Sequence, residues 1–288
     1  MTKELGILST KNVLFHLYGS VEASVDGVRI GLGTEKERRM IVPLLLTIRR
    51  PVSYLELADW MWDGPPSTAP DDLGRHMGDF RARLVELGLR GALVNRDRVC
   101  RLNVLPDQVD AHRLRAVLAE AERLDDHTAA GQLREALALC AGEPLSGLAG
   151  HRIDSCRQIL TEERRRAQLM LIRVEFRLGH AAHRLPDLMR LFRDRPEDAE
   201  VATLAMRALA GAGRQAEALA VFRRCCERLI ELGMKVPPGM AELHLRILRV
   251  IYRCRERPGE IRFEARRRLR VDRHRLDARL ALPGREGA

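Results

Sequence analysis

Apolar positions alternate with polar ones near the start of the chain and then recur at helical spacing almost to its end. The alternation covers residues 13–32 and places apolar side chains at Val13, Phe15, Leu17, Val21, Ala23 and Val25. Together with the turn-forming pair Asp26-Gly27, it predicts a small antiparallel sheet. A helix over residues 34–48 is predicted next, because Thr34 and Glu37 form a Ser/Thr-x-x-Glu capping pattern at its start.

Residues 53–102 carry the pattern around which we expect the first part of the fold to be organised. Ser53 and Glu56 repeat the capping pattern ahead of a short helix, which the Gly-Pro-Pro sequence at 64–66 ends. A second helix is predicted over residues 71–87, with one buried stripe formed by Leu73, Met77, Phe80 and Leu84. Two short strands around residues 95–98 complete the order of a winged helix-turn-helix. In that fold the second helix enters the major groove of DNA and the hairpin lies beside it.

From Val109 onward the pattern is that of consecutive amphipathic helices, with Asp110 expected to cap the first. The predicted helices cover residues 110–124, 129–141, 154–178, 184–194, 197–210, 214–232 and 238–254. Residues 131–139 resemble residues 213–221, and Gly179 lies 34 residues before Gly213, which is the tetratricopeptide period. The fold class is therefore expected to be an α+β N-terminal winged helix-turn-helix followed by an all-α, tetratricopeptide-like helical-repeat domain. The expected domains are 1–105, 106–255 and a basic tail at 256–288.

Composition excludes several classes of protein. No run of 18 apolar residues is present, so a membrane partner is not expected. The six cysteines form no Cys-x-x-Cys pair, which favours buried free thiols and a cytoplasmic location. No catalytic motif or phosphate-binding loop occurs, so we expect neither an enzyme nor a cofactor. His180 and His183 have the spacing of metal ligands, but no third ligand is evident, so we do not expect a metal site. The net charge of +10 suggests a polyanionic partner, although residues 1–105 contribute only +2 of it.

The span from about Phe15 to Leu248 resembles the antibiotic-regulatory (SARP) family of bacterial transcription activators. The most specific matching stretch is Gly213-Arg-Gln-Ala-Glu-Ala-Leu-Ala-Val-Phe-Arg223, followed by Leu232-Gly233 and residues 237–244. Shorter matches in the same order include Val25-Asp26-Gly27, Pro65-Pro66 and Leu93-Val94. The resemblance implies an OmpR-like winged helix joined to a bacterial transcriptional activation domain. It also implies binding to directly repeated promoter sites and recruitment of RNA polymerase holoenzyme.

The candidate site residues follow from the winged-helix interpretation and this resemblance. Residues expected to contact DNA are Arg75, His76, Asp79, Arg81, Arg83, Arg96, Arg98 and Arg101. The loop expected to face RNA polymerase contains Asp63, Gly64, Pro65, Pro66, Ser67 and Thr68. Asp79 departs from the family, in which arginine is common at this position, and Val99-Cys100 replaces the family's Gly-Tyr in the hairpin. Asp79 either accepts a hydrogen bond from a cytosine amino group or pairs with Arg75 or Arg83.

Two functions are consistent with this sequence. The first is a sequence-specific, DNA-binding activator of a secondary-metabolite, antibiotic-type biosynthetic gene cluster. The alternative is a helical-repeat adaptor, or a peptide- or effector-binding protein, whose degenerate winged helix does not read DNA. Further partner candidates are a second copy of the chain on DNA and a peptide or small-molecule effector in the helical-repeat domain.

Overall fold

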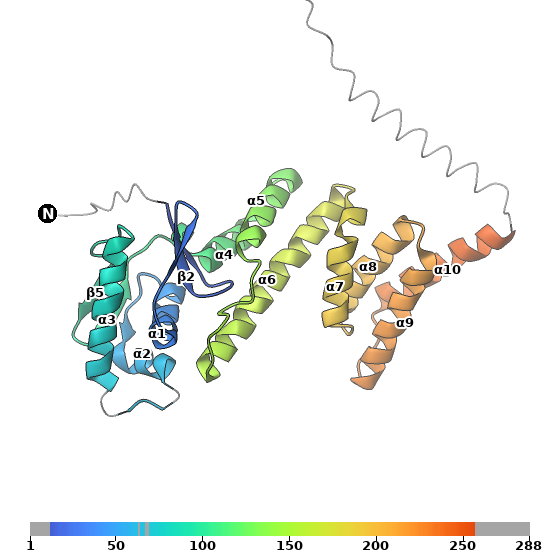
Figure 1. The fold of residues 1–288 in the computed structure, drawn as a ribbon. Helices are drawn as coiled ribbons and strands as arrows, with labels where there is room; N and C mark the ends of the chain where they lie inside the picture. The colour runs from blue at the N-terminus through green and yellow to red at the C-terminus, as the bar shows by residue number, and fades with distance from the viewer. Residues whose placement is uncertain (1–11, 63, 67–68, 257–288) are drawn as a thin grey trace, which may run out of the picture. The chain divides into compact units, whose positions relative to one another are not determined.

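The computed structural model describes residues 12–62, 64–66 and 69–256 (Figure 1). Its backbone contacts divide the chain into two compact units, one ending at Gly179 and the other beginning at His180. The boundary predicted after residue 105 lies inside the first unit and stays a prediction. Nearly all of the predicted basic tail lies outside the described residues.

The first unit begins with a three-stranded antiparallel sheet in the order β1-β2-β3. Its strands are β1 (Val13–His16), β2 (Glu22–Val25) and β3 (Val28–Gly31). Asp26 and Gly27 connect β2 to β3 with φ angles of 50° and 86°, as the two-residue hairpin turn requires. The sheet predicted from the alternating pattern is therefore confirmed, including its turn.

Three helices and a second sheet complete the winged helix. The helices are α1 (Glu35–Leu46), α2 (Tyr54–Met61) and α3 (Ala69–Glu86), and the strands are β4 (Val52–Ser53), β5 (Leu93–Arg96) and β6 (Val99–Leu102). The capping pattern of α1 is confirmed, because Glu37 N donates to the Thr34 hydroxyl and Thr34 N donates to the Glu37 carboxylate. The sequence analysis missed β4, a two-residue strand that pairs with β6 and gives the sheet order β4-β6-β5.

Three longer helices and one short 3-10 helix follow within the same unit. They are η1 (Pro106–Gln108), α4 (Asp110–Glu120), α5 (Asp126–Leu139) and α6 (His151–Arg177). Helix α5 begins three residues before its predicted start, because the Asp125 carboxylate accepts hydrogen bonds from the backbone of His127 and Thr128. The internal similarity therefore has limits: Gly131 lies within α5, whereas Gly213 precedes α9 with a φ of 77°.

The buried carboxylate of Asp110, at the start of α4, binds the backbone of the two residues that directly follow β1. Asp110 is fully buried and accepts backbone hydrogen bonds from Leu17, Tyr18 and Ala111 at 2.7–3.0 Å. The prediction that Asp110 caps α4 was wrong, since Val109 occupies the cap position and two of the three donors come from the start of the chain. The Tyr18 hydroxyl also donates to the Leu160 carbonyl at 2.9 Å. One continuous hydrophobic core consequently runs from β1 into α6.

The second unit consists of helices packed against their neighbours in sequence. It contains η2 (Ala181–Arg184), α7 (Leu185–Asp194), α8 (Ala199–Gly211), α9 (Gln215–Glu231) and α10 (Pro238–Glu256). Helix α8 packs against both α7 and α9, and α10 packs against α8 and α9. The predicted helices of this unit are confirmed, with bounds that shift by a few residues at most.

Two expectations from composition can be compared with the described residues. Cys100, Cys140, Cys156 and Cys225 are buried free thiols, and Cys226 is a half-buried one, which confirms the expectation of unpaired thiols for these five of the six cysteines. Burial raises the pKa of the Cys100 thiol to about 11, so this group is a poor nucleophile at neutral pH. Within the described part of the chain, every helix is too short or too polar to cross a membrane.

Candidate nucleic-acid interface

Helix α3 has one buried side and one exposed side, as its sequence pattern predicts. Leu73, Met77, Phe80 and Leu84 are each about 1% exposed and anchor the helix on the core. Burial of such side chains stabilises the fold by roughly 1.5–3 kcal/mol each. The opposite side carries the exposed residues Asp71, Arg75 and Asp79, and Arg81 is exposed at the edge of the buried stripe. Arg75 lies 3.4 Å from Asp72, and its side chain remains 69% exposed. Arg75, Asp79 and Arg81 are thus available to a partner.

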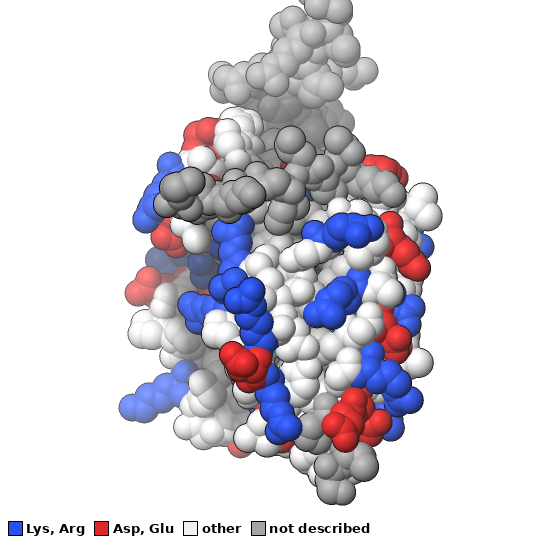
Figure 2. Space-filling model, turned by 90° about the vertical axis from the view of Figure 1, so that its left-hand side faces the viewer, with Lys and Arg blue, Asp and Glu red and all other residues white. Residues whose placement is uncertain are grey.

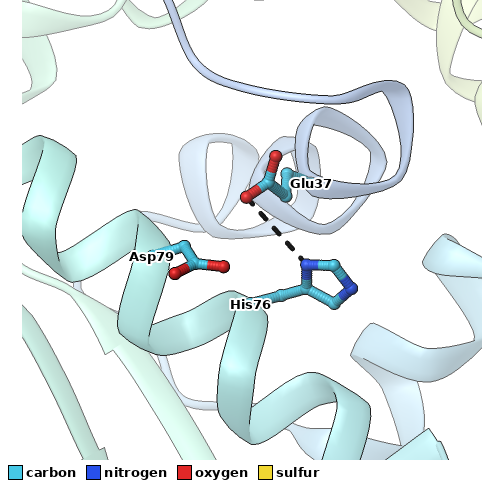
Figure 3. Close-up of side chains that lie close together, drawn as sticks. All are labelled: Glu37, His76 and Asp79. Carbon is cyan, nitrogen blue, oxygen red and sulfur yellow. Dashed lines mark ion pairs between the residues drawn. The ribbon is translucent and has the colours of Figure 1, made fainter.

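His76 and Arg83, two of the predicted contact residues, instead face α1 and lie beside Glu37. An Arg83 guanidinium nitrogen lies 3.2 Å from the Glu37 carboxylate, and His76 Nδ1 lies 4.0 Å from it (Figure 3). Burial opposes ionisation of Glu37, but hydrogen bonds from Thr34 and Arg83 outweigh it and hold the pKa of this carboxyl below its usual value. Arg83 is half-buried and partly neutralised, so it is a weaker candidate for phosphate contact than the exposed arginines.

Glu37, His76 and Asp79 are also the group of described residues whose ligand atoms lie close enough together to hold a metal ion, all within 4.8 Å. Figure 3 shows His76 turned toward Glu37, with Asp79 beside it on the next turn of α3. The Glu37 carboxylate already accepts hydrogen bonds from Thr34 N at 2.6 Å and from Arg83. A cation at this position would compete with Thr34 N and the Arg83 guanidinium for the Glu37 oxygens. The contacts therefore support a structural role for Glu37, which fixes α3 to α1. The sequence analysis identified Glu37 only as a helix cap.

The wing, residues 93–102 of the β5–β6 hairpin, ends in a tight two-residue turn. Asp97 and Arg98 form this turn with φ angles of 52° and 60°. Its position is fixed by α2, because Tyr54 N donates to the Arg98 carbonyl at 2.9 Å and Asn95 Nδ2 donates to the Tyr54 hydroxyl at 2.6 Å. The Arg98 side chain is exposed at the turn.

The two remaining wing arginines share one face of the hairpin. Arg101 is paired with Val94, and Arg96 is paired with Val99. Because residues opposite each other in an antiparallel pair project to the same side, Arg96 and Arg101 share the face away from the core. Cys100, on the other face, is buried against Met77 of α3. All three predicted wing arginines are therefore exposed.

Charges of both signs are present around α3 and the wing. On the side of the protein that carries α3 and β5, basic side chains are interspersed with acidic ones and with uncharged surface (Figure 2). The described part of the predicted polymerase loop, Gly64, Pro65 and Pro66, is exposed. Asp63, Ser67 and Thr68 lie outside the described residues.

Comparison with known proteins gives matches over both parts of the first unit and into the second. Residues 109–248 match the model of the bacterial transcriptional activator domain. The regulatory protein AfsR of Streptomyces coelicolor is 32% identical over 243 residues, which cover 81% of this chain and 24% of AfsR. The transcriptional regulatory protein EmbR of Mycobacterium tuberculosis is 26% identical over 250 residues, covering 83% of this chain and 64% of EmbR. The chain thus spans about a quarter of the length of AfsR and just under two thirds of EmbR.

The same relationship is found among solved structures. The structure of Mycobacterium tuberculosis EmbR in complex with a low-affinity phosphopeptide has a TM-score of 0.75 and 26% sequence identity, covering 83% of this chain and 65% of the EmbR chain. This coverage exceeds the helical part alone and therefore includes residues of the winged helix. The chain belongs to the antibiotic-regulatory (SARP, AfsR-like) family of bacterial transcriptional regulators.

Proposed function

We propose that this transcriptional regulator binds double-stranded promoter DNA sequence-specifically, in the cytoplasm, through α3 and the wing. The observation that carries the proposal is a set of exposed arginines on these two adjacent elements: Arg75, Arg81, Arg96, Arg98 and Arg101. Arginines so placed neutralise phosphates and release counterions, which supplies much of the affinity of a protein for DNA. Helix α3 would lie in the major groove and the wing beside it.

The remaining parts of the proposal come from the family. The regulator acts without catalysis as an activator of a secondary-metabolite biosynthetic gene cluster, binding direct promoter repeats as two copies of the chain. The exposed loop at residues 64–66 contacts RNA polymerase holoenzyme. The helices after residue 109 form a tetratricopeptide-like repeat that receives a peptide or small-molecule effector. The packing of α8 between α7 and α9 supports the repeat architecture, since tetratricopeptide-like repeats stack neighbouring helices.

A second candidate function is that of an adaptor whose winged helix contacts protein instead of DNA. The exposed carboxylates of Asp71 and Asp79 on α3 favour it, because carboxylates are repelled by a phosphate backbone. The pairing of Arg83 with Glu37 favours it too, since it removes one positive charge from the candidate contact surface.

The double variant Arg96→Ala/Arg98→Ala tests DNA binding by the wing. Fluorescence anisotropy on a duplex from the promoter region next to the gene, and on a scrambled duplex, should show weaker binding to both. The slope of log affinity against log salt should fall by roughly one for each lost phosphate contact. This is expected because backbone contacts carry no sequence information.

Arg223→Ala/Arg224→Ala provides a matched control. Both arginines are exposed on α9 in the second unit, and their removal changes the net charge equally. If this control lowers the affinity and slope as much as the wing variant does, the wing makes no specific contribution. If the unmodified chain binds neither duplex at low salt, the adaptor function is favoured.

A further inference from the structure

An open cavity of about 530 Å³ lies in the first unit, bounded by η1, α4 and α5. Its walls are largely apolar and include Leu105, Pro106, Ala116, Val117, Ala136 and Leu139. This volume falls within the range of about 300–1,000 Å³ that is typical of small-molecule sites. Asp107 and Glu135 also line this cavity together with Arg113, so it carries charges of both signs.

A second cavity of about 310 Å³ adjoins the first, with Arg113 and Leu139 contributing to both. Its other walls come from the β1–β3 sheet. The charged residues that line it, among the described residues, are both cations: Arg29 of β3 and Arg113 of α4. Glu22 lies 3.4 Å from Arg29 but does not line the cavity. The second cavity is therefore electrostatically suited to an anion.

His16 adds a buried polar group to the second cavity. The residue is only 5% exposed, its Nε2 lies 2.8 Å from the Ser24 hydroxyl, and its Nδ1 has no hydrogen-bond partner among the described residues. Burial and the nearby Arg29 lower the pKa of His16, which keeps the ring neutral at physiological pH. When the Ser24 hydroxyl donates to Nε2, Nδ1 carries the proton and is a buried donor without a partner among the described residues.

We infer that the two cavities together bind a small amphipathic organic anion. Its apolar body occupies the cavity between η1, α4 and α5, and its carboxylate or similar head group lies between Arg29 and Arg113. Apolar burial supplies affinity in the first cavity. Charge-assisted hydrogen bonds from the two guanidinium groups fix the orientation of the head group in the second. This inference specifies the small-molecule effector of the proposed function and places part of its site on the β1–β3 sheet, ahead of the helical repeat. It depends only on the cavities and is tested without DNA.

Two probes with an apolar body and an anionic head distinguish the aliphatic and aromatic forms of this chemistry. Decanoate is titrated by calorimetry and 1-anilinonaphthalene-8-sulfonate by fluorescence, each against the full chain. Decanol, with the same tail as decanoate and no charge, is the control ligand. Saturable binding of either anion supports the inference and identifies whether the apolar body is aliphatic or aromatic. If decanoate binds, decanol should bind about tenfold more weakly, because it lacks the negative charge.

Variants then locate the site. Arg29→Gln and Arg113→Gln should each weaken binding of the anions about five- to tenfold and leave decanol binding unchanged. Ala116→Trp should weaken all three ligands, because Ala116 is an exposed part of the apolar wall and the larger side chain fills the cavity. Arg223→Gln on α9 is the matched control for the loss of one charge, and circular dichroism checks that each variant is folded.

Three results would overturn the inference. They are equal affinity for decanoate and decanol, losses in Arg29→Gln no larger than in Arg223→Gln, and no saturable binding of either anion up to millimolar concentration. Arg29→Gln keeps the test decisive if Arg113→Gln disturbs the fold, since Arg113 also donates to the backbone carbonyl of Asp107. A failure of DNA binding would leave these titrations unaffected, so the two proposals fail separately.

Discussion

Replacement of Asp110 by asparagine tests how the winged helix is joined to the helices that follow it. The Asp110 carboxylate accepts hydrogen bonds from three backbone N–H groups, two of which belong to residues more than 90 positions earlier. An asparagine side chain offers one acceptor oxygen, and its amide group is itself a donor. At least one buried N–H group therefore loses its partner, which costs about 1–3 kcal/mol.

The contribution of Asp110 to the free energy of unfolding depends on pH, because its carboxyl has a different pKa in the folded and the unfolded chain. Burial raises the pKa of this carboxyl to about 6, despite the opposing effect of the backbone hydrogen bonds. An aspartate in an unfolded chain titrates at about 3.9. Between the two values the folded protein holds a proton that the unfolded chain has released. The stability that Asp110 contributes is thus fully present below about pH 3.9 and is lost as the pH rises through 6.

The expected size of the effect follows from the same linkage. A difference of about two pKa units corresponds to about 3 kcal/mol, of which roughly 1–2 kcal/mol is lost between pH 5 and pH 7.5. Asparagine does not titrate, so Asp110→Asn should destabilise the protein more at pH 5 than at pH 7.5, by that amount. Comparison of variant with wild type removes the contribution of other groups, such as His16 and His112, whose pKa values are lowered by burial.

Urea unfolding at several pH values measures this difference. Tryptophan fluorescence is a suitable signal, because Trp60 and Trp62 are the two tryptophans of the chain and both lie in the winged helix. Asp107→Asn, at an exposed aspartate in η1, gives the baseline for loss of a carboxylate in the same segment. A free-energy difference between Asp110→Asn and wild type that does not change with pH, or that grows as the pH rises, would refute the reasoning.

Two further predictions concern close packing and the exposed side of α3. Gly142→Ala should destabilise the first unit by about 1–3 kcal/mol in the same urea assay, since its Cβ would lie 2.7 Å from the Cα of Gly19. Gly131→Ala is the control, because Gly131 lies within α5 and no atom lies within 4 Å of the added Cβ; this change should stabilise the first unit by up to about 1 kcal/mol. Equal effects of the two substitutions would contradict tight packing at Gly142. Asp79→Arg should raise affinity for a scrambled duplex several-fold at low salt, because it changes the charge of an exposed α3 position by two. Unchanged anisotropy titrations with folded protein would show that this side of α3 does not face DNA.

The sequence by itself determined the elements whose signals are local. Thr34 and Glu37 gave the start of α1, Asp26-Gly27 gave the first hairpin, and the spacing of Leu73 to Leu84 gave the buried side of α3. Capping hydrogen bonds, turn conformations and apolar periodicity all act within a few residues, so they can be predicted from neighbouring positions in the sequence. Asp125 carries the same kind of local signal, because its carboxylate caps the start of α5 three residues before the predicted one.

Only the tertiary structure decided which side chains are available and which are used in packing. Asp110 has the local signature of a helix cap, yet its carboxylate satisfies the backbone of Leu17 and Tyr18 at the end of β1. Arg83 is expected to contact DNA from its position on α3, yet its guanidinium group pairs with Glu37, 46 residues earlier. These pairings depend on how distant segments pack, because a buried polar group must find a partner wherever the fold brings one close. Local spacing carries no information about that partner, and the two adjoining cavities around Arg113 could not be inferred from it for the same reason.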